Sequence, residues 1–105
     1  MVHNELIDKA FKLGFESYFG VMTSVNPKCY HLWMANLQRW LREKHSLYVM
    51  LEETETLSSE SGIGFYYKII KVKDKEHLRL EYSNYFYKTY EEALEAGLKE
   101  GLKLI

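Results

Sequence analysis

The sequence predicts one small two-layer α+β domain over residues 1–105, in which a three-stranded antiparallel meander packs against helices in the order α-α-β-β-β-α. Three observations lead to this prediction. Apolar residues recur at helical spacing near both ends of the chain. Three segments between them alternate in polarity, and short connections favour pairing of consecutive strands.

The first helix is expected over residues 4–13, and Gly14 can end it in the left-handed conformation. Residues 15–24 have no clear period and are expected to form an ordered connection with large side chains against the core. Those side chains are Phe15, Tyr18, Phe19, Val21 and Met22.

The second helix is expected to start at Asn26-Pro27, because an Asx cap is followed there by proline at the first helical position. It should run to about His45, with a mostly basic last turn that complements the helix dipole. Its apolar face carries Tyr30, Trp33, Leu37, Trp40 and Leu41, with Met34 beside them.

The strands are expected over residues 46–53 and 63–73 and from about Leu78 to Tyr87. A polar loop joins the first two, and Asp74-Lys75 is expected to form a tight turn before the third. In the third strand Leu78, Leu80 and Tyr82 are expected on the buried side, with Arg79 and Glu81 opposite. Ser83-Asn84 should bend or bulge this strand before Tyr85-Phe86-Tyr87.

The last helix has a capping box formed by Thr89 and Glu92. Behind it, Leu94, Leu98 and Leu102 form one ridge, and Ala93, Gly97 and Gly101 form the neighbouring ridge. A glycine inside a helix costs about 1 kcal/mol relative to alanine, so Gly97 and Gly101 predict a close approach. The approaching surface is either the domain's own sheet, which we favour, or a second chain in a self-association seam.

The composition argues against several functions. There are 14 basic and 15 acidic side chains, so the chain lacks the basic excess typical of phosphate binding. The single Cys29 excludes an internal disulfide and suits a reducing compartment. We see no signal-peptide pattern and no apolar run near the ~18 residues that span a bilayer. A cytoplasmic protein is therefore expected.

No catalytic, cofactor or metal site is expected. Cys29 and His31 are two residues apart, which points them to different faces of a helix. With His45 they invite a nucleophile or metal interpretation, but a Cys–His pair needs an orienting third group and a zinc site needs three or four convergent ligands. The acidic residues Glu52, Glu53, Glu55 and Glu60 fit a solvated strand end and loop. We expect the two longer helices to settle on the same side of the meander and to leave no concave place for reactive groups.

The outer sheet face is the predicted interaction surface, and Tyr48, Tyr66, Lys68 and Arg79 share it if the register is right. Aromatic faces can stack on bases while cations hold phosphates. Alternatively the tyrosines simply suit a half-buried sheet, and the charges pair across strands with Glu81 and Glu52. The basic end of the second helix, Arg39, Arg42 and Lys44, is another candidate for nucleic-acid contact.

Two stretches, residues 40–45 leading into a strand and residues 89–98, resemble a group of small uncharacterised bacterial proteins of phages, prophages and mobile elements. This resemblance implies a small α+β domain and assigns no functional residue. The element order from Pro27 onward is also similar to the double-stranded RNA-binding domain. That family places lysines at the start of its last helix, whereas this chain has Glu91 and Glu92, which repel phosphate.

The sequence therefore predicts a non-enzymatic domain without cofactor or metal. It is expected to act through protein contacts, either with another protein or with itself as a homodimer. Nucleic-acid binding, with a topology like that of the double-stranded RNA-binding domain, is the alternative.

Overall fold

The computed structural model describes residues 1–18, 20–57, 60–83 and 86–105. It confirms the α+β fold and the order of its elements. The expectations for Phe19, Asn84 and Tyr85 lie outside the described residues. The elements are α1 (Glu5–Lys12), a 3-10 turn (Pro27–Cys29), α2 (Tyr30–His45), β1 (Leu47–Glu55), β2 (Ile63–Lys73), β3 (Glu76–Tyr82) and α3 (Tyr90–Leu102).

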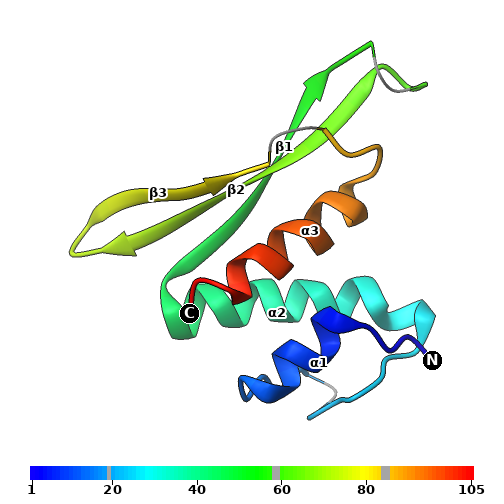
Figure 1. Ribbon diagram of the computed structural model, residues 1–105, viewed down its shortest axis with the longest axis vertical. Coiled ribbons are helices and arrows are strands. Elements are labelled where there is room, and N and C mark those ends of the chain that lie inside the picture. Colours follow the sequence, from blue (N-terminus) through cyan, green and yellow to red (C-terminus); the bar gives the residue numbers. More distant parts are fainter. Residues whose placement is uncertain (19, 58–59, 84–85) are drawn as a thin grey trace.

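The domain has two layers (Figure 1). The sheet has the order β1-β2-β3, and both neighbouring pairs are antiparallel. Helix α2 packs on β1, α3 packs on β1 and β2, and α1 packs on α3. The tips of the β1–β2 and β2–β3 hairpins extend past this helical layer. No helix in the described part of the chain is both long and apolar enough to cross a membrane.

The core lies between α2, α3 and the inner sheet face. Trp33 is 1% exposed and its ring meets the ring of Phe15 edge-on, with centroids 5.6 Å apart. Trp40 was expected on the same buried face, but it is only half-buried between the rings of Phe15 and His45. The other fully buried side chains of this layer include Leu37, Leu41, Leu47, Val49, Ile69, Leu98 and Leu102.

Side-chain caps begin α1 and α3, and the sequence predicts the cap at Thr89. The side chain of Asn4 accepts a hydrogen bond from the Ile7 N–H, and the Thr89 hydroxyl accepts one from the Glu92 N–H at 3.1 Å. Asn26 caps the 3-10 turn rather than α2, so the α-helix begins at Tyr30, one turn later than expected.

The connection after α1 is only partly packed on the core, which corrects the prediction for residues 15–24. Phe15 is buried and Met22 contacts the core, as expected. Tyr18 and Val21 are 87% and 59% exposed, respectively. The cause is a tight turn, because Ser17 and Gly20 exchange two backbone hydrogen bonds at 3.0 and 2.9 Å. Tyr18 lies within this turn and Val21 directly follows it, and neither side chain is packed on the core.

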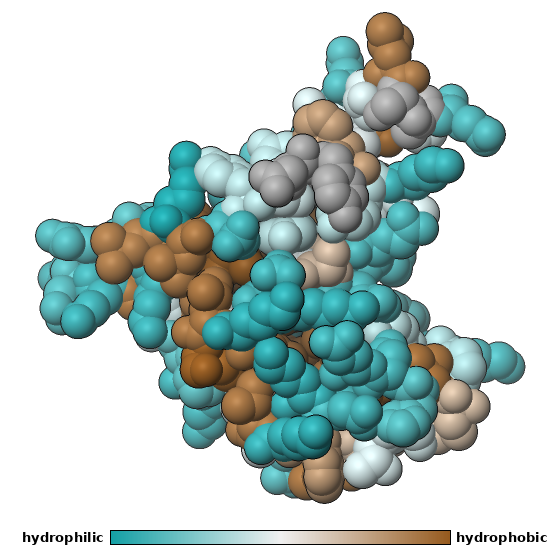
Figure 2. Space-filling view, viewed as in Figure 1, coloured by the Kyte–Doolittle hydropathy of each residue, from teal (hydrophilic) through white to brown (hydrophobic). Residues whose placement is uncertain are grey.

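The third strand departs most from the prediction. The expected buried residues Leu78, Leu80 and Tyr82 are 46%, 39% and 38% exposed. One cause is that the helices cover β1 and β2, so β3 lies beyond them. Apolar side chains accordingly gather at the surface of the β2–β3 arm in Figure 2.

A β-bulge is the second cause. Ile69 pairs with Glu81 and Ile70 pairs with Arg79, so Leu80 is an additional residue in β3. Beyond the bulge, each side chain of β3 faces the side of the sheet opposite to the one that simple alternation predicts. Glu81 therefore faces the helical side with Ile69, and Tyr82 faces the opposite side with Lys68. The turn before β3 is as predicted, with positive φ at both Asp74 and Lys75, as in type I′ hairpins.

Candidate functional site

The sheet face opposite the helices brings the four predicted surface residues together. The register pairs Tyr48 with Ile70 and Ile70 with Arg79, which sets these side chains in one row. Tyr66 and Lys68 alternate with buried Tyr67 and Ile69, and so they lie on the same outer face. We call this surface the open face and define it by Tyr48, Met50, Glu52, Tyr66, Lys68, Ile70, Arg79 and Tyr82.

The charges of the open face interact mainly with one another. Lys68 forms an ion pair with Glu52, and the Tyr66 hydroxyl donates a hydrogen bond to the same carboxylate. The Lys68 ammonium and then the Tyr66 hydroxyl lower the pKa of Glu52, and the Glu52 carboxylate raises the pKa of Tyr66. The Arg79 guanidinium lies 4.6 Å from the centre of the Tyr82 ring. The pairing of Lys68 with Glu52 agrees with the cross-strand alternative, whereas Glu81 lies on the other face.

The helical glycines lie inside the domain. A Cβ atom on Gly97 would stand 2.8 Å from Val49 Cγ1 and 3.0 Å from Tyr67 Cβ, and one on Gly101 would stand 3.1 Å from Val49 Cγ2. Both glycines are buried against the sheet of their own chain. They therefore offer no surface for a seam with a second chain.

A groove of about 600 Å³ lies between the start of α2 and the first turns of α3, where the sequence predicts no concave site. Tyr30, Met34 and Ala96 supply apolar lining, and Glu91, Glu92 and Glu95 supply carboxylates. These residues come from two helices separated by the whole sheet in the sequence, so periodicity within either helix could not reveal the groove.

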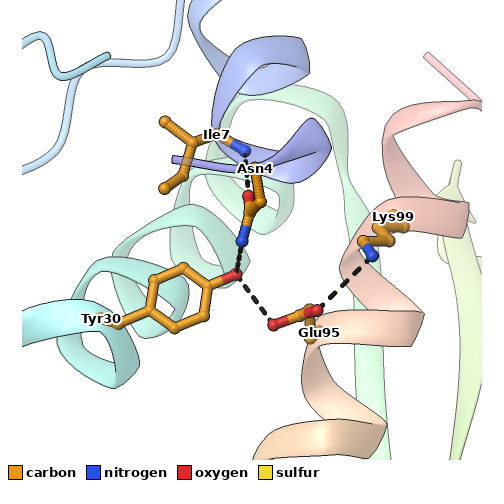
Figure 3. A network of polar contacts seen from close by, with 5 residues as sticks. All are labelled: Asn4, Ile7, Tyr30, Glu95 and Lys99. Atoms are coloured by element: carbon orange, nitrogen blue, oxygen red, sulfur yellow. Dashed lines mark hydrogen bonds and ion pairs between the residues drawn. The ribbon is translucent and has the colours of Figure 1, made fainter. Parts of the chain in front are cut away.

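A chain of polar contacts fixes one wall of this groove (Figure 3). The Asn4 amide donates to the Tyr30 hydroxyl, which donates to Glu95 Oε2, both at 2.9 Å. Glu95 Oε1 lies 3.5 Å from the Lys99 ammonium. Burial is the main cause that raises the pKa of Tyr30 far above its ordinary value, and the Glu95 carboxylate adds to the effect. The hydroxyl stays protonated at neutral pH and donates its hydrogen bond to Glu95.

As the pH rises, the Tyr30→Phe variant is expected to lose less stability than the native chain. The unfolded chain releases the Tyr30 proton near pH 10, whereas the folded protein keeps it. Above that pH the unfolded state binds fewer protons, so stability falls as pH rises through the window between the two pKa values. Urea denaturation from about pH 8 to about pH 11 should show a shallower decline for Tyr30→Phe than for the native chain.

The matched control for this measurement is Tyr90→Phe, which removes a hydroxyl from an exposed tyrosine. Tyr90→Phe retains the buried Tyr30 hydroxyl, so its stability should decline with pH more steeply than that of Tyr30→Phe. Equal slopes for Tyr30→Phe and Tyr90→Phe would contradict the role of the buried hydroxyl.

The remaining candidate residues are dispersed. Cys29 packs against the core, and His31 lines the groove. The His45 ring meets Trp40, and Arg39 pairs with Glu43 at 2.9 Å. Outside residues 19, 58–59 and 84–85, no group of three or more His, Cys, Asp or Glu side chains is arranged to hold a metal ion.

No protein-family model, curated protein or solved structure matches this chain. The surface features that bear on its function are the open face with the adjoining β3 strand and the α2–α3 groove.

Proposed function

We propose that this chain is a non-enzymatic protein-binding domain that self-associates through β3 and the adjoining open face. The observation that carries the proposal is that β3 is uncovered on both of its faces. Leu78 lies on the helical side, opposite Lys71, and Tyr82 lies on the open face, opposite Lys68. Each remains more than one third exposed. A contiguous exposed apolar patch is typical of an interaction surface, and apolar side chains gather on the β2–β3 arm in Figure 2.

The open face extends this apolar surface. Met50 is 42% exposed, and Phe86, whose ring contacts Tyr66 at 5.6 Å between centroids, is 47% exposed. Ile70 lies half-buried between the half-buried Tyr48 on β1 and Arg79 on β3. Aromatic residues and methionine are enriched in protein interfaces.

Charge pairing favours a second copy as the partner. Glu52 is already neutralised by Lys68, so a partner need not supply a cation for it. Arg79 already rests on the Tyr82 ring. Because the Lys68–Glu52 pair carries no net charge, this part of the open face is compatible with a copy of itself, and closed two-fold dimers are the commonest protein assemblies. We place this assembly in the cytoplasm, because a lone cysteine fits a reducing compartment.

The nucleic-acid alternative has less support from the same geometry. Of the predicted cations Lys68 and Arg79, the first is neutralised by Glu52. On the helical side, Glu91 and Glu92 occupy the first turn of α3, where they repel phosphate. The proposal of a protein partner needs neither a basic surface nor release of counterions from a nucleic acid.

Light scattering after size-exclusion chromatography tests self-association. Over protein concentrations from about 10 µM to about 500 µM, the mass is expected to rise from one protomer, 12.5 kDa, towards twice that value. Leu78→Glu should remain at the mass of one protomer throughout. The new carboxylate lies opposite Lys71 in the ladder, so this variant is expected to keep its fold.

Leu32→Glu is the matched control, because Leu32 is 47% exposed on α2, outside the proposed surface. It should associate as the native chain does. A native chain that stays at one protomer mass at the highest concentration, or two variants that dissociate equally, would overturn the proposal.

A further inference from the structure

We propose that the α2–α3 groove binds a lysine or arginine side chain of another protein. This inference does not depend on self-association, because none of the residues that carry it belongs to β3 or the open face. It rests on three properties of the groove: its excess of carboxylates, its apolar lining, and the fixed position of its central carboxylate.

The charge of the groove is negative. Three carboxylates, Glu91, Glu92 and Glu95, face one ammonium group, that of Lys99. Lys99 is engaged by Glu95 at 3.5 Å. Glu91 and Glu92 are exposed, and within the described part of the chain neither carboxylate forms a hydrogen bond or ion pair. A cation with hydrogen-bond donors would complement these two groups.

The lining suits the stem of a basic side chain as well as its head. Ala96 presents apolar atoms to the groove, and Tyr30 presents its ring. Lysine and arginine bury their aliphatic stems along such surfaces while the charged end stays among polar groups. The ring of Tyr30 also offers a face for a cation. This ring is held in place by stacking on the Trp33 ring, with centroids 5.9 Å apart.

The central carboxylate is preorganised. Glu95 is held by the Tyr30 hydroxyl on one oxygen and by Lys99 on the other, and Asn4 in turn fixes Tyr30 (Figure 3). A group that is already positioned loses little freedom when a ligand arrives. The groove therefore offers one fixed carboxylate and two that can move towards an incoming cation.

The test uses capped pentapeptides with alanine at every position except the third, which carries arginine, lysine, norleucine or glutamate. Each is titrated into the ¹⁵N-labelled full chain and followed by the backbone amide signals. The arginine and lysine peptides should give saturable shifts centred on Tyr30, Glu92 and Ala96. The norleucine and glutamate peptides should give much weaker shifts or none.

Substitution of the carboxylates identifies the site. The double variant Glu91→Gln/Glu92→Gln should weaken binding of the arginine peptide about tenfold or more. It keeps the Thr89 cap, which uses the Glu92 N–H and not its side chain. The double variant Glu53→Gln/Glu55→Gln, with the same change in charge on exposed residues of β1, should bind as the native chain does.

Three results would overturn the proposal. They are the absence of saturable shifts with both basic peptides, equal binding of the norleucine peptide, and equal weakening by the two double variants. The last result would mean that the peptide responds only to overall charge. Self-association measured by light scattering is a separate readout, so either proposal can fail while the other stands.

Discussion

Replacing Trp33 with alanine is expected to lower the free energy of unfolding by about 3–5 kcal/mol, the largest effect of any substitution considered. Trp33 is 1% exposed in the centre of the core, where its ring contacts Phe15 and Tyr30. Its removal leaves a cavity that the packed helices and sheet can fill only in part. Guanidinium denaturation followed by circular dichroism measures the loss without relying on tryptophan fluorescence.

Trp40→Ala is the matched control, because Trp40 lies on the same helix but is only half-buried. It should cost clearly less than Trp33→Ala. If Trp33→Ala does not fold, Trp33→Phe keeps an aromatic ring and should still be less stable than the native chain. A loss below about 1 kcal/mol for Trp33→Ala, or equal losses at both positions, would mean that the core is centred elsewhere.

Replacing Gly97 with alanine is expected to destabilise the domain by about 1–3 kcal/mol, although alanine is the better helix former by about 1 kcal/mol. The added Cβ would meet Val49 Cγ1 at 2.8 Å and Tyr67 Cβ at 3.0 Å. Both atoms belong to packed strand residues close to the backbone, so neither can move away easily. Helix α3 would have to shift from the sheet.

Gly101→Ala is the comparison for this effect, measured by the same denaturation. Its nearest contact would be Val49 Cγ2 at 3.1 Å, and its next contacts lie at 3.5 Å. A small adjustment suffices there, so the gain in helix propensity should leave the change near zero or stabilising. The opposite order of the two variants would contradict the close approach of α3 at Gly97.

Local signals in the sequence predicted most of the fold. The side chain of Thr89 caps α3 as predicted, and Asp74-Lys75 form the predicted tight turn. The alternation of residues in β1 and β2 gave the correct inner and outer faces. These features depend on residues within a few positions of one another, and such short-range patterns are legible in one sequence.

Longer-range features could not be predicted. Leu78 and Leu80 are exposed because the helical layer does not reach across β3. No local pattern in the sequence specifies how far that layer extends. The bulge at Leu80 reversed the expected faces of Glu81 and Tyr82. The groove depends on Tyr30 and Glu95, which are 65 residues apart in the chain but joined by a hydrogen bond of 2.9 Å.

The two proposed surfaces have different chemical character. The β3 surface with the open face carries exposed apolar side chains and an internal Lys68–Glu52 ion pair, which suits a copy of itself. The groove carries unmatched carboxylates beside an apolar lining, which suits a basic side chain. A domain with both could assemble with itself on one side and hold a second protein on the other.

The most direct test of self-association through β3 is an isotope-filtered nuclear Overhauser experiment on an equal mixture of ¹³C-labelled and unlabelled chains at high concentration. We expect contacts between chains from the methyl groups of Leu78 and Leu80, accompanied by contacts from Met50 or the Tyr82 ring on the open face. Contacts between chains confined to helix residues such as Leu32 and Phe11, or no contacts at all, would contradict this account.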